Sequence, residues 1–103
     1  MAAVLTEAEI DEALTSLPGW SRGEKAIVAD FTFRDFNDAL IFVNSVAQAA
    51  EQMNHHPDID IRYNKVRMLL TSHDSGGVTR RDTRMAKQIS DIFAQSQPAD
   101  KDG

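Results

Sequence analysis

The chain has 103 residues, of which 42% are hydrophobic and 26% are charged, a composition typical of a soluble globular protein rather than a disordered or fibrous one. Eleven Lys and Arg against sixteen Asp and Glu give a formal net charge of −5, which disfavours binding to nucleic acid or anionic lipid through the overall field. There is no cysteine, so disulfides, thiolate metal sites and cysteine nucleophiles are excluded. The first residues carry no readable secretory signal, and we expect a cytoplasmic protein.

The first element is predicted to be a helix that starts at Thr6. Thr6 and Glu9 have the spacing of a capping box, in which each side chain accepts a hydrogen bond from the backbone of the other residue. Apolar residues then recur at helical intervals from Ile10 to Leu17. Pro18-Gly19 is expected to end the helix.

Two strands are predicted next, over residues 20–22 and 26–33. Ile27, Ala29, Phe31 and Phe33 alternate with mostly polar residues, as in a strand with one buried face. Gly23-Glu24 is the predicted turn between the strands. This segment is therefore expected to form a β-hairpin.

The longest predicted element is a helix over residues 35–53, and Pro57 requires it to end shortly before that residue. Ile41 lies outside its apolar stripe and Phe42 lies at the edge of the stripe, which suggests a helix surface covered by another subunit. The stripe consists of Phe36, Ala39, Leu40, Val43, Val46, Ala47 and Ala50.

A second hairpin is predicted over residues 58–71. Its apolar residues change from odd positions to even positions near Asn64, which a two-residue turn explains. Asn64-Lys65 is the predicted turn, because Asn accepts a left-handed conformation more readily than other side chains. This register places Tyr63 opposite Val66, Ile61 opposite Met68, and Ile59 opposite Leu70.

The last predicted element is a helix after a loop that contains Gly76-Gly77. Thr79 and Asp82 repeat the capping spacing, and the apolar stripe is Met85, Ala86, Ile89, Ile92 and Phe93. Residues 1–95 are expected to form one domain, and residues 96–103 a polar, mobile tail. The element order αββαββα predicts an α+β fold, with an antiparallel sheet and the helices on one of its faces.

The histidines are the most informative candidates for a functional site. The chain has three of them, His55, His56 and His73. Extending the predicted register places His56 opposite His73 and His55 opposite Asp74, so all three are expected to gather at one end of the sheet. Imidazole accepts and donates protons near neutral pH, and such a cluster suits paired general acid and base catalysis.

Other interpretations of the histidines stay open at this point. Any one of them fits the role of a helix cap, and the three together fit a metal site with Asp74 or Glu51 as a further ligand. None of the usual metal-ligand spacings or phosphate-binding glycine loops is present. Asp82 fits either a helix cap or the orientation of an imidazole, and Glu51 fits either a pair with His55 or an exposed charge.

These residues resemble a known family. Glu51 to Pro57, then Tyr63-Asn64-Lys65-Val66, then Thr71 to Asp74, and Gly77-Val78-Thr79 with Asp82 are similar to pterin-4a-carbinolamine dehydratase, and the resemblance covers nearly the whole chain. It implies a four-stranded antiparallel sheet with three helices on one face, assembled as homodimers or homotetramers. It also implies dehydration of 4a-hydroxytetrahydropterin to quinonoid dihydropterin, without a metal or organic cofactor. This reaction would serve tetrahydropterin recycling for an aromatic amino acid hydroxylase.

The resemblance also implies roles for particular residues. His55 and His73 would be the acid–base pair, and His56 would mainly orient the substrate. The remaining pterin contacts would be Pro57 and the segment Ser72, His73, Asp74 and Ser75, with Glu51 and Asp82 in support. Ile59 stands where relatives often have Trp, and Val78 where many have Leu, so the pocket wall is expected to differ in shape. The alternative function is a binding module without catalysis, since some relatives stabilise a transcription-factor dimer or assist protein assembly.

Overall fold

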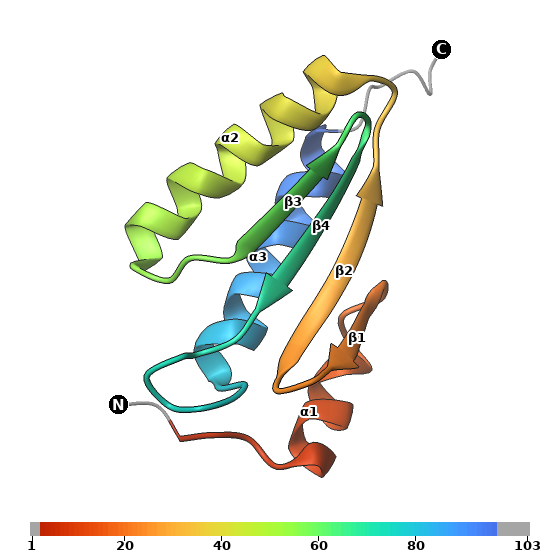
Figure 1. The fold of residues 1–103 in the computed structure, drawn as a ribbon. Helices are drawn as coiled ribbons and strands as arrows, with labels where there is room; N and C mark the ends of the chain where they lie inside the picture. Colours follow the sequence, from red (N-terminus) through yellow and green to blue (C-terminus); the bar gives the residue numbers. More distant parts are fainter. Residues whose placement is uncertain (1–2, 97–103) are drawn as a thin grey trace.

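The structure, a computed structural model, describes residues 3–96 and forms a four-stranded antiparallel sheet with three helices (Figure 1). The strands lie in the order β1-β2-β4-β3, so the two hairpins join through their second strands. The predicted α+β fold and the order αββαββα are confirmed. The elements are α1 Glu7–Leu14, β1 Trp20–Gly23, β2 Ala26–Thr32, α2 Phe36–Met53, β3 Asp58–Arg62, β4 Lys65–Leu70 and α3 Arg80–Ser96.

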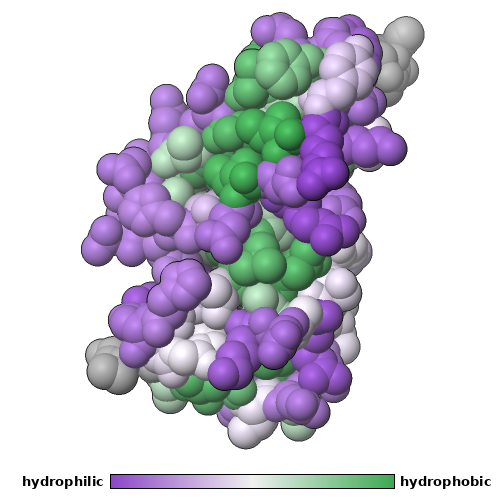
Figure 2. All heavy atoms as spheres, in the orientation of Figure 1, coloured by the Kyte–Doolittle hydropathy of each residue, from purple (hydrophilic) through white to green (hydrophobic). Residues whose placement is uncertain are grey.

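The hydrophobic core lies between the sheet and its helices. Alternate residues of the two central strands β2 and β4 face it, among them Ile27 and Met68, which are completely buried. The intervening side chains, such as Asp30 and Arg67, face outward. Figure 2 shows hydrophilic side chains over much of the surface seen in Figure 1, with an apolar area in its upper half. The predicted period-two alternation is therefore the pattern of a sheet with one buried face.

Local interactions set the helix ends. The capping box of α1 is present: the Glu9 N–H donates to Thr6 Oγ1 at 3.1 Å, and the Thr6 N–H donates to Glu9 Oε1 at 2.8 Å. Asp35 caps α2 by accepting the Asp38 N–H at 2.9 Å. Helix α1 ends at Leu14, earlier than predicted, and Leu17 packs into the core beyond it.

The predicted turn of the first hairpin is wrong by one residue. Gly23 pairs with Ala26 as the last pair of the ladder, so the turn consists of Glu24 and Lys25 rather than Gly23 and Glu24. Lys25 adopts a positive φ of 56°. The hairpin itself is confirmed, and Ile27, Ala29, Phe31 and Phe33 are all buried as their alternation predicts.

The predicted register of the second hairpin is also wrong, by two residues. Ile59 pairs with Met68 and Ile61 with Val66, so the turn consists of Tyr63 and Asn64. A shift of two leaves every apolar residue on the same face, which is why alternation could not detect it. A contact with the neighbouring strand accompanies the observed turn: the Asn64 side-chain amide donates to the Phe33 carbonyl at 2.8 Å, and the Phe33 N–H donates to the Asn64 carbonyl at 2.8 Å.

Tyr63 occupies a strained position in this turn. It has a φ of 53°, and its side chain is 65% exposed, so it combines a left-handed backbone with little packing. Tyr63→Gly is expected to raise the free energy of unfolding by about 0.5 kcal/mol, because the relief of strain exceeds the entropy cost of glycine. Tyr63→Val is expected to lower it by about 1 kcal/mol, because a β-branched residue tolerates this conformation least. Urea unfolding of the two variants measures both changes, and a less stable glycine variant would show that ring packing outweighs the strain.

The buried face of α2 differs from the predicted stripe. Phe42, expected at its edge, is completely buried, with ring centroids 5.1 Å from Phe31, 4.9 Å from Phe33 and 5.9 Å from Phe93. Phe36, expected in the stripe, is 47% exposed. Ile41 is 52% exposed, as its position outside the stripe predicts. Aromatic rings on β2, directly after β2 and on α3 pack against Phe42, so Phe42 belongs to the buried face of α2. The apolar pattern of one helix contains no information about such contacts with other elements.

Helix α3 agrees with its predicted stripe. Met85, Ala86 and Ile89 are fully buried, and Ile92 and Phe93 pack at the margin of the core. Ser96, the first residue of the predicted tail, is the last residue of this helix, and residues 97–103 lie outside the described part of the chain. Among residues 3–96, no helix has the length and apolar character needed to cross a membrane.

Candidate active site

The three histidines meet at one end of the sheet. His55 and His56 lie between α2 and the start of β3, and His73 follows the end of β4. All three line one open hollow of about 220 Å³, together with Asn54, Thr71, Ser72 and Asp74. The predicted convergence is present, although the observed register would continue with Thr71, rather than His73, opposite His56.

His55 is held in the interior by the end of α2 and by the start of α3. Asn54 ends α2 in the left-handed conformation, with φ 52°, and the next backbone N–H, that of His55, returns to the Ala50 carbonyl at 3.1 Å. The His55 side chain is only 8% exposed, and its Nε2 lies 2.5 Å from Oδ1 of Asp82. An ionised carboxylate can only accept, so this contact assigns the proton to Nε2 and leaves Nδ1 as the second ring nitrogen.

Asp82 is completely buried and joins three segments of the chain. Its Oδ1 contacts His55, while Oδ2 accepts the Thr79 N–H at 2.9 Å and the Ser72 hydroxyl at 2.8 Å. The two roles considered for Asp82, helix cap and imidazole partner, are therefore filled at the same time. The capping box is incomplete, because Thr79 Oγ1 accepts the Arg81 N–H, at 3.2 Å, and not that of Asp82.

His73 is presented on a short loop that closes on itself. The Ser72 N–H donates to the Gly77 carbonyl at 3.0 Å, and the Ser72 carbonyl accepts the N–H groups of Ser75 and Gly76 at 3.0 and 2.9 Å. The Ser72 hydroxyl is buried against Thr79 and Asp82. Ser72 therefore stabilises the loop through its hydrogen bonds. Its contact with a substrate stays a prediction. The His73 side chain is exposed, and it has no hydrogen-bond partner within residues 3–96.

Glu51 pairs with a different histidine from the one considered in the sequence. Its Oε2 lies 2.6 Å from Nε2 of His56, five residues further along, and both side chains are largely exposed. His55 points into the interior and contacts Asp82, so Glu51 pairs with His56 instead. Pro57 is half-buried and lies directly before β3.

Asp74, expected as a substrate contact or metal ligand, is bound by an arginine. Nη2 of Arg81 donates to Asp74 Oδ1 at 2.5 Å and to the Ser75 hydroxyl at 3.3 Å. The hydrogen bond from Arg81 lowers the pKa of Asp74 below its usual value. Arg81 was not among the residues predicted from the sequence. The sequence feature that could have identified Arg81 is a cation in the first turn of a helix, where the helix dipole favours acidic residues.

No metal site forms around these residues. Within residues 3–96, no group of three or more His, Cys, Asp or Glu side chains is arranged to hold a metal ion. Both acidic residues considered as ligands, Asp74 and Glu51, have other partners. The arrangement of the site instead suits proton transfer: a buried imidazole with an aspartate behind it, and an exposed imidazole across the same hollow.

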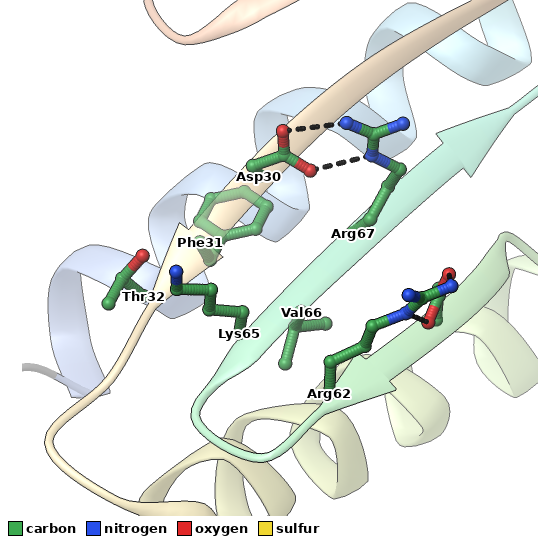
Figure 3. Close-up of a pocket in the computed structure, with 8 residues that line it drawn as sticks. Asp30, Phe31, Thr32, Arg62, Lys65, Val66 and Arg67 are labelled. Carbon is green, nitrogen blue, oxygen red and sulfur yellow. Dashed lines mark hydrogen bonds and ion pairs between the residues drawn. The ribbon is translucent and has the colours of Figure 1, made fainter.

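A larger hollow, of about 560 Å³, lies at the opposite end of the strands (Figure 3). Two ion pairs line it: Arg67 donates to the two Asp30 oxygens at 2.7 and 3.0 Å, and Arg62 contacts Asp60 at 3.2 Å. The hydrogen bonds from Arg67 lower the pKa of Asp30. This hollow contains no histidine, and four of its five charged side chains are paired with one another, so it is a poorer candidate for acid–base chemistry than the smaller one.

The fold and this site define a small α+β protein with a histidine cluster at one end of an antiparallel sheet. The model of the family described as Pterin 4 alpha carbinolamine dehydratase matches residues 3–92. The chain belongs to this family. The predicted resemblance is thereby confirmed at the level of the family.

Individual relatives agree with this assignment. A Koribacter versatilis protein provisionally named pterin-4-alpha-carbinolamine dehydratase is 51% identical over 92 residues, which cover 89% of this chain and 98% of the relative. A similarly named protein of Thermomicrobium roseum is 46% identical over 87% of this chain and 97% of its own. Among solved structures, a transcriptional coactivator/pterin dehydratase from Brucella melitensis matches with a TM-score of 0.84 and 40% identity, covering 87% of this chain and 98% of its own.

A more distant structure shares the fold alone. It is a pterin dehydratase-like protein identified as a RuBisCO assembly factor in the alpha-carboxysome, with a TM-score of 0.63 and 17% identity. The match covers 73% of this chain and 89% of that one. The fold is therefore also found in a protein named for assembly rather than for catalysis.

Proposed function

We propose that this protein is a hydro-lyase that dehydrates 4a-hydroxytetrahydropterin to quinonoid dihydropterin. The observation that carries the proposal is the convergence of His55, His56 and His73 on one hollow in a chain of this family. The hollow is small, but a second one of about 260 Å³ shares Thr71 and His73 with it. Together the two fall within the size range of small-molecule sites, roughly 300–1,000 Å³.

The reaction requires a base and an acid on one substrate. The proton on N5 leaves, the N5–C4a double bond forms, and the bond from C4a to the hydroxyl oxygen breaks as that oxygen gains a proton and departs as water. No electrons are exchanged with another reactant. A positioned base and a positioned acid each contribute on the order of 10²- to 10⁴-fold to such a step.

The geometry favours His55 as the base and His73 as the acid. With the proton of neutral His55 on Nε2, donated to Asp82, Nδ1 is the nitrogen able to accept a proton. Asp82 then stabilises the imidazolium that forms. His73 is exposed on its loop and would donate its proton to the leaving hydroxyl. His56, paired with Glu51, would orient the pterin, and Pro57 and residues 72–75 would contact its ring.

Stopped-flow kinetics with enzymatically generated 4a-hydroxytetrahydropterin tests this proposal. The folded protein is expected to accelerate loss of the carbinolamine well beyond the uncatalysed rate. The added rate should be proportional to protein concentration. Albumin at the same concentration controls for nonspecific catalysis by protein side chains. No acceleration by folded protein would overturn the enzyme assignment.

The second candidate function is a binding module without catalysis. It is favoured by the names of two structural neighbours, one a transcriptional coactivator/pterin dehydratase and the other an assembly factor. The complete histidine set favours the enzyme instead, because a protein that had lost the chemistry has no need to keep it. A folded His73→Ala variant that retained full function in cells would support the binding module.

Assembly and cellular role belong to the same proposal. Dimers or tetramers are proposed from the family, and the exposed Phe36 and Ile41 on α2 provide apolar surface for such contacts. We also propose a cytoplasmic location and, from the reaction that the family resemblance implies, a link to an aromatic amino acid hydroxylase.

A further inference from the structure

The first turn of α3 touches both segments that carry the proposed acid and base. Asp82 contacts His55, and the preceding residue, Arg81, contacts Asp74 and Ser75 directly after His73. Two consecutive residues on one rigid helix therefore hold the two sides of the hollow. Of these two residues, only Asp82 has a role in the proposed reaction.

The loop has separate anchors at its base and at its tip. At the base, Ser72 is fixed by its own hydrogen bonds across the loop and by its hydroxyl contact with Asp82. At the tip, a single nitrogen of Arg81 reaches the side chains of both Asp74 and Ser75. His73 is exposed on this loop, so contacts that hold the loop tip also limit how far its ring can move.

The position of Arg81 costs free energy of folding unless its contact with Asp74 offsets that cost. A cation in the first turn of a helix opposes the helix dipole. In addition, Nε of Arg81 is buried without a hydrogen-bond partner among the described residues, which costs desolvation energy. Arg80, its neighbour in the same turn, is exposed to solvent and bears no such cost. The Asp74 contact provides the compensating charge.

We propose that Arg81 is a positioning residue, which fixes His73 relative to His55 by clamping the loop tip through Asp74 and Ser75. The inference rests on the proposed function for its kinetic consequences. Misplacement of a catalytic group by about 1 Å can reduce a rate about 100-fold. Loss of the clamp is therefore expected to lower kcat by a larger factor than it raises KM, because the loop tip carries His73 as well as the proposed pterin contacts.

The kinetic test compares Arg81→Gln, which removes the charge, with Arg81→Lys, which retains it. Arg81→Gln is expected to lower kcat by about 10- to 100-fold, Arg81→Lys to restore part of the loss, and the matched control Arg80→Gln to keep the wild-type rate. In a His73→Ala background, Arg81→Gln should add little further loss, because the group it positions is gone. Equal losses in both backgrounds, or a wild-type rate for Arg81→Gln, would overturn the proposal.

A second measurement does not depend on catalysis. The clamp lowers the pKa of Asp74 in the folded protein, so its contribution is present above the usual aspartate pKa of 3.8 and is lost as pH falls through the lowered value. In a ¹³C NMR titration, the Asp74 carboxyl should therefore titrate below 3.8, and Arg81→Gln should raise its midpoint toward 3.8. An unchanged midpoint would refute the clamp. A raised midpoint in a protein without dehydratase activity would uphold the clamp and reject the proposed function.

If Arg81→Gln fails to fold, Asp74→Asn provides the second variant. Asp74 is 58% exposed, so this change is expected to leave stability within about 0.5 kcal/mol of wild type. It should reproduce the kcat loss of Arg81→Gln, and the double variant should be no slower than either single one. A wild-type kcat for Asp74→Asn would contradict a clamp that acts through the loop tip.

Discussion

His73→Ala is expected to slow the dehydration of 4a-hydroxytetrahydropterin by about 10²- to 10⁴-fold without changing the stability of the fold. His73 is exposed on its loop, so its removal should change the free energy of unfolding by no more than about 0.5 kcal/mol. A rate loss at constant stability would separate chemistry from structure. Wild-type kinetics in this variant would show that His73 is not the proton donor.

His55 needs a different substitution, because it is buried against Asp82. His55→Gln keeps a side-chain N–H that can reach Asp82 but cannot act as a base, whereas His55→Ala leaves the carboxylate without its partner. We expect His55→Gln to fold and to lose rate by a similar 10²- to 10⁴-fold factor.

The pH–rate profile assigns the two histidines. Removal of the base should abolish the acid limb of the profile, and removal of the acid should abolish the alkaline limb. The opposite result would exchange the roles of His55 and His73. His56→Ala is expected to act mainly on KM, in keeping with an exposed, orienting group.

Asp82→Ala is expected to cause the largest loss of stability, about 3–5 kcal/mol. Asp82 is completely buried, and its removal leaves the His55 ring, the Thr79 N–H and the Ser72 hydroxyl without their common acceptor. Stabilities of domains are typically about 5–15 kcal/mol, so the variant should unfold at a much lower urea concentration. Trp20, buried beside Ser90 on α3, provides the fluorescence signal for the measurement.

Two further variants define the cause of this loss. Asp82→Asn keeps the shape but presents an amide N–H₂ group to a set of donors, and a loss of about 2 kcal/mol is expected. Asp91→Ala on the same helix removes an exposed carboxylate paired with Lys87, and it should cost no more than about 0.5 kcal/mol. If Asp82→Ala were as stable as Asp91→Ala, the buried network would not contribute to folding.

The sequence by itself determined the order of the elements and the gathering of the histidines at one end of the sheet. Hydrophobic periodicity predicted all three helices and both hairpins, because one-sided burial imposes a period of 3.6 on helices and 2 on strands. The capping pair Thr6 and Glu9 located the start of α1. The hairpin topology also brought His55, His56 and His73 to one end of the sheet, since a hairpin returns the chain to the place from which it left.

Only the tertiary structure decided the register and the partners. Alternation is unchanged by a shift of two residues, so the turn at Tyr63 and Asn64 became identifiable only through the strand pairing and the hydrogen bonds of Asn64 with Phe33, the residue after β2. In the same way, Asp82 lies 27 residues from His55 in the chain, and nothing local connects them. The pairs of Glu51 with His56 and Arg81 with Asp74 follow from which side chains the fold turns inward. Long-range contacts of this kind depend on how the elements pack, and local periodicity carries no information about them.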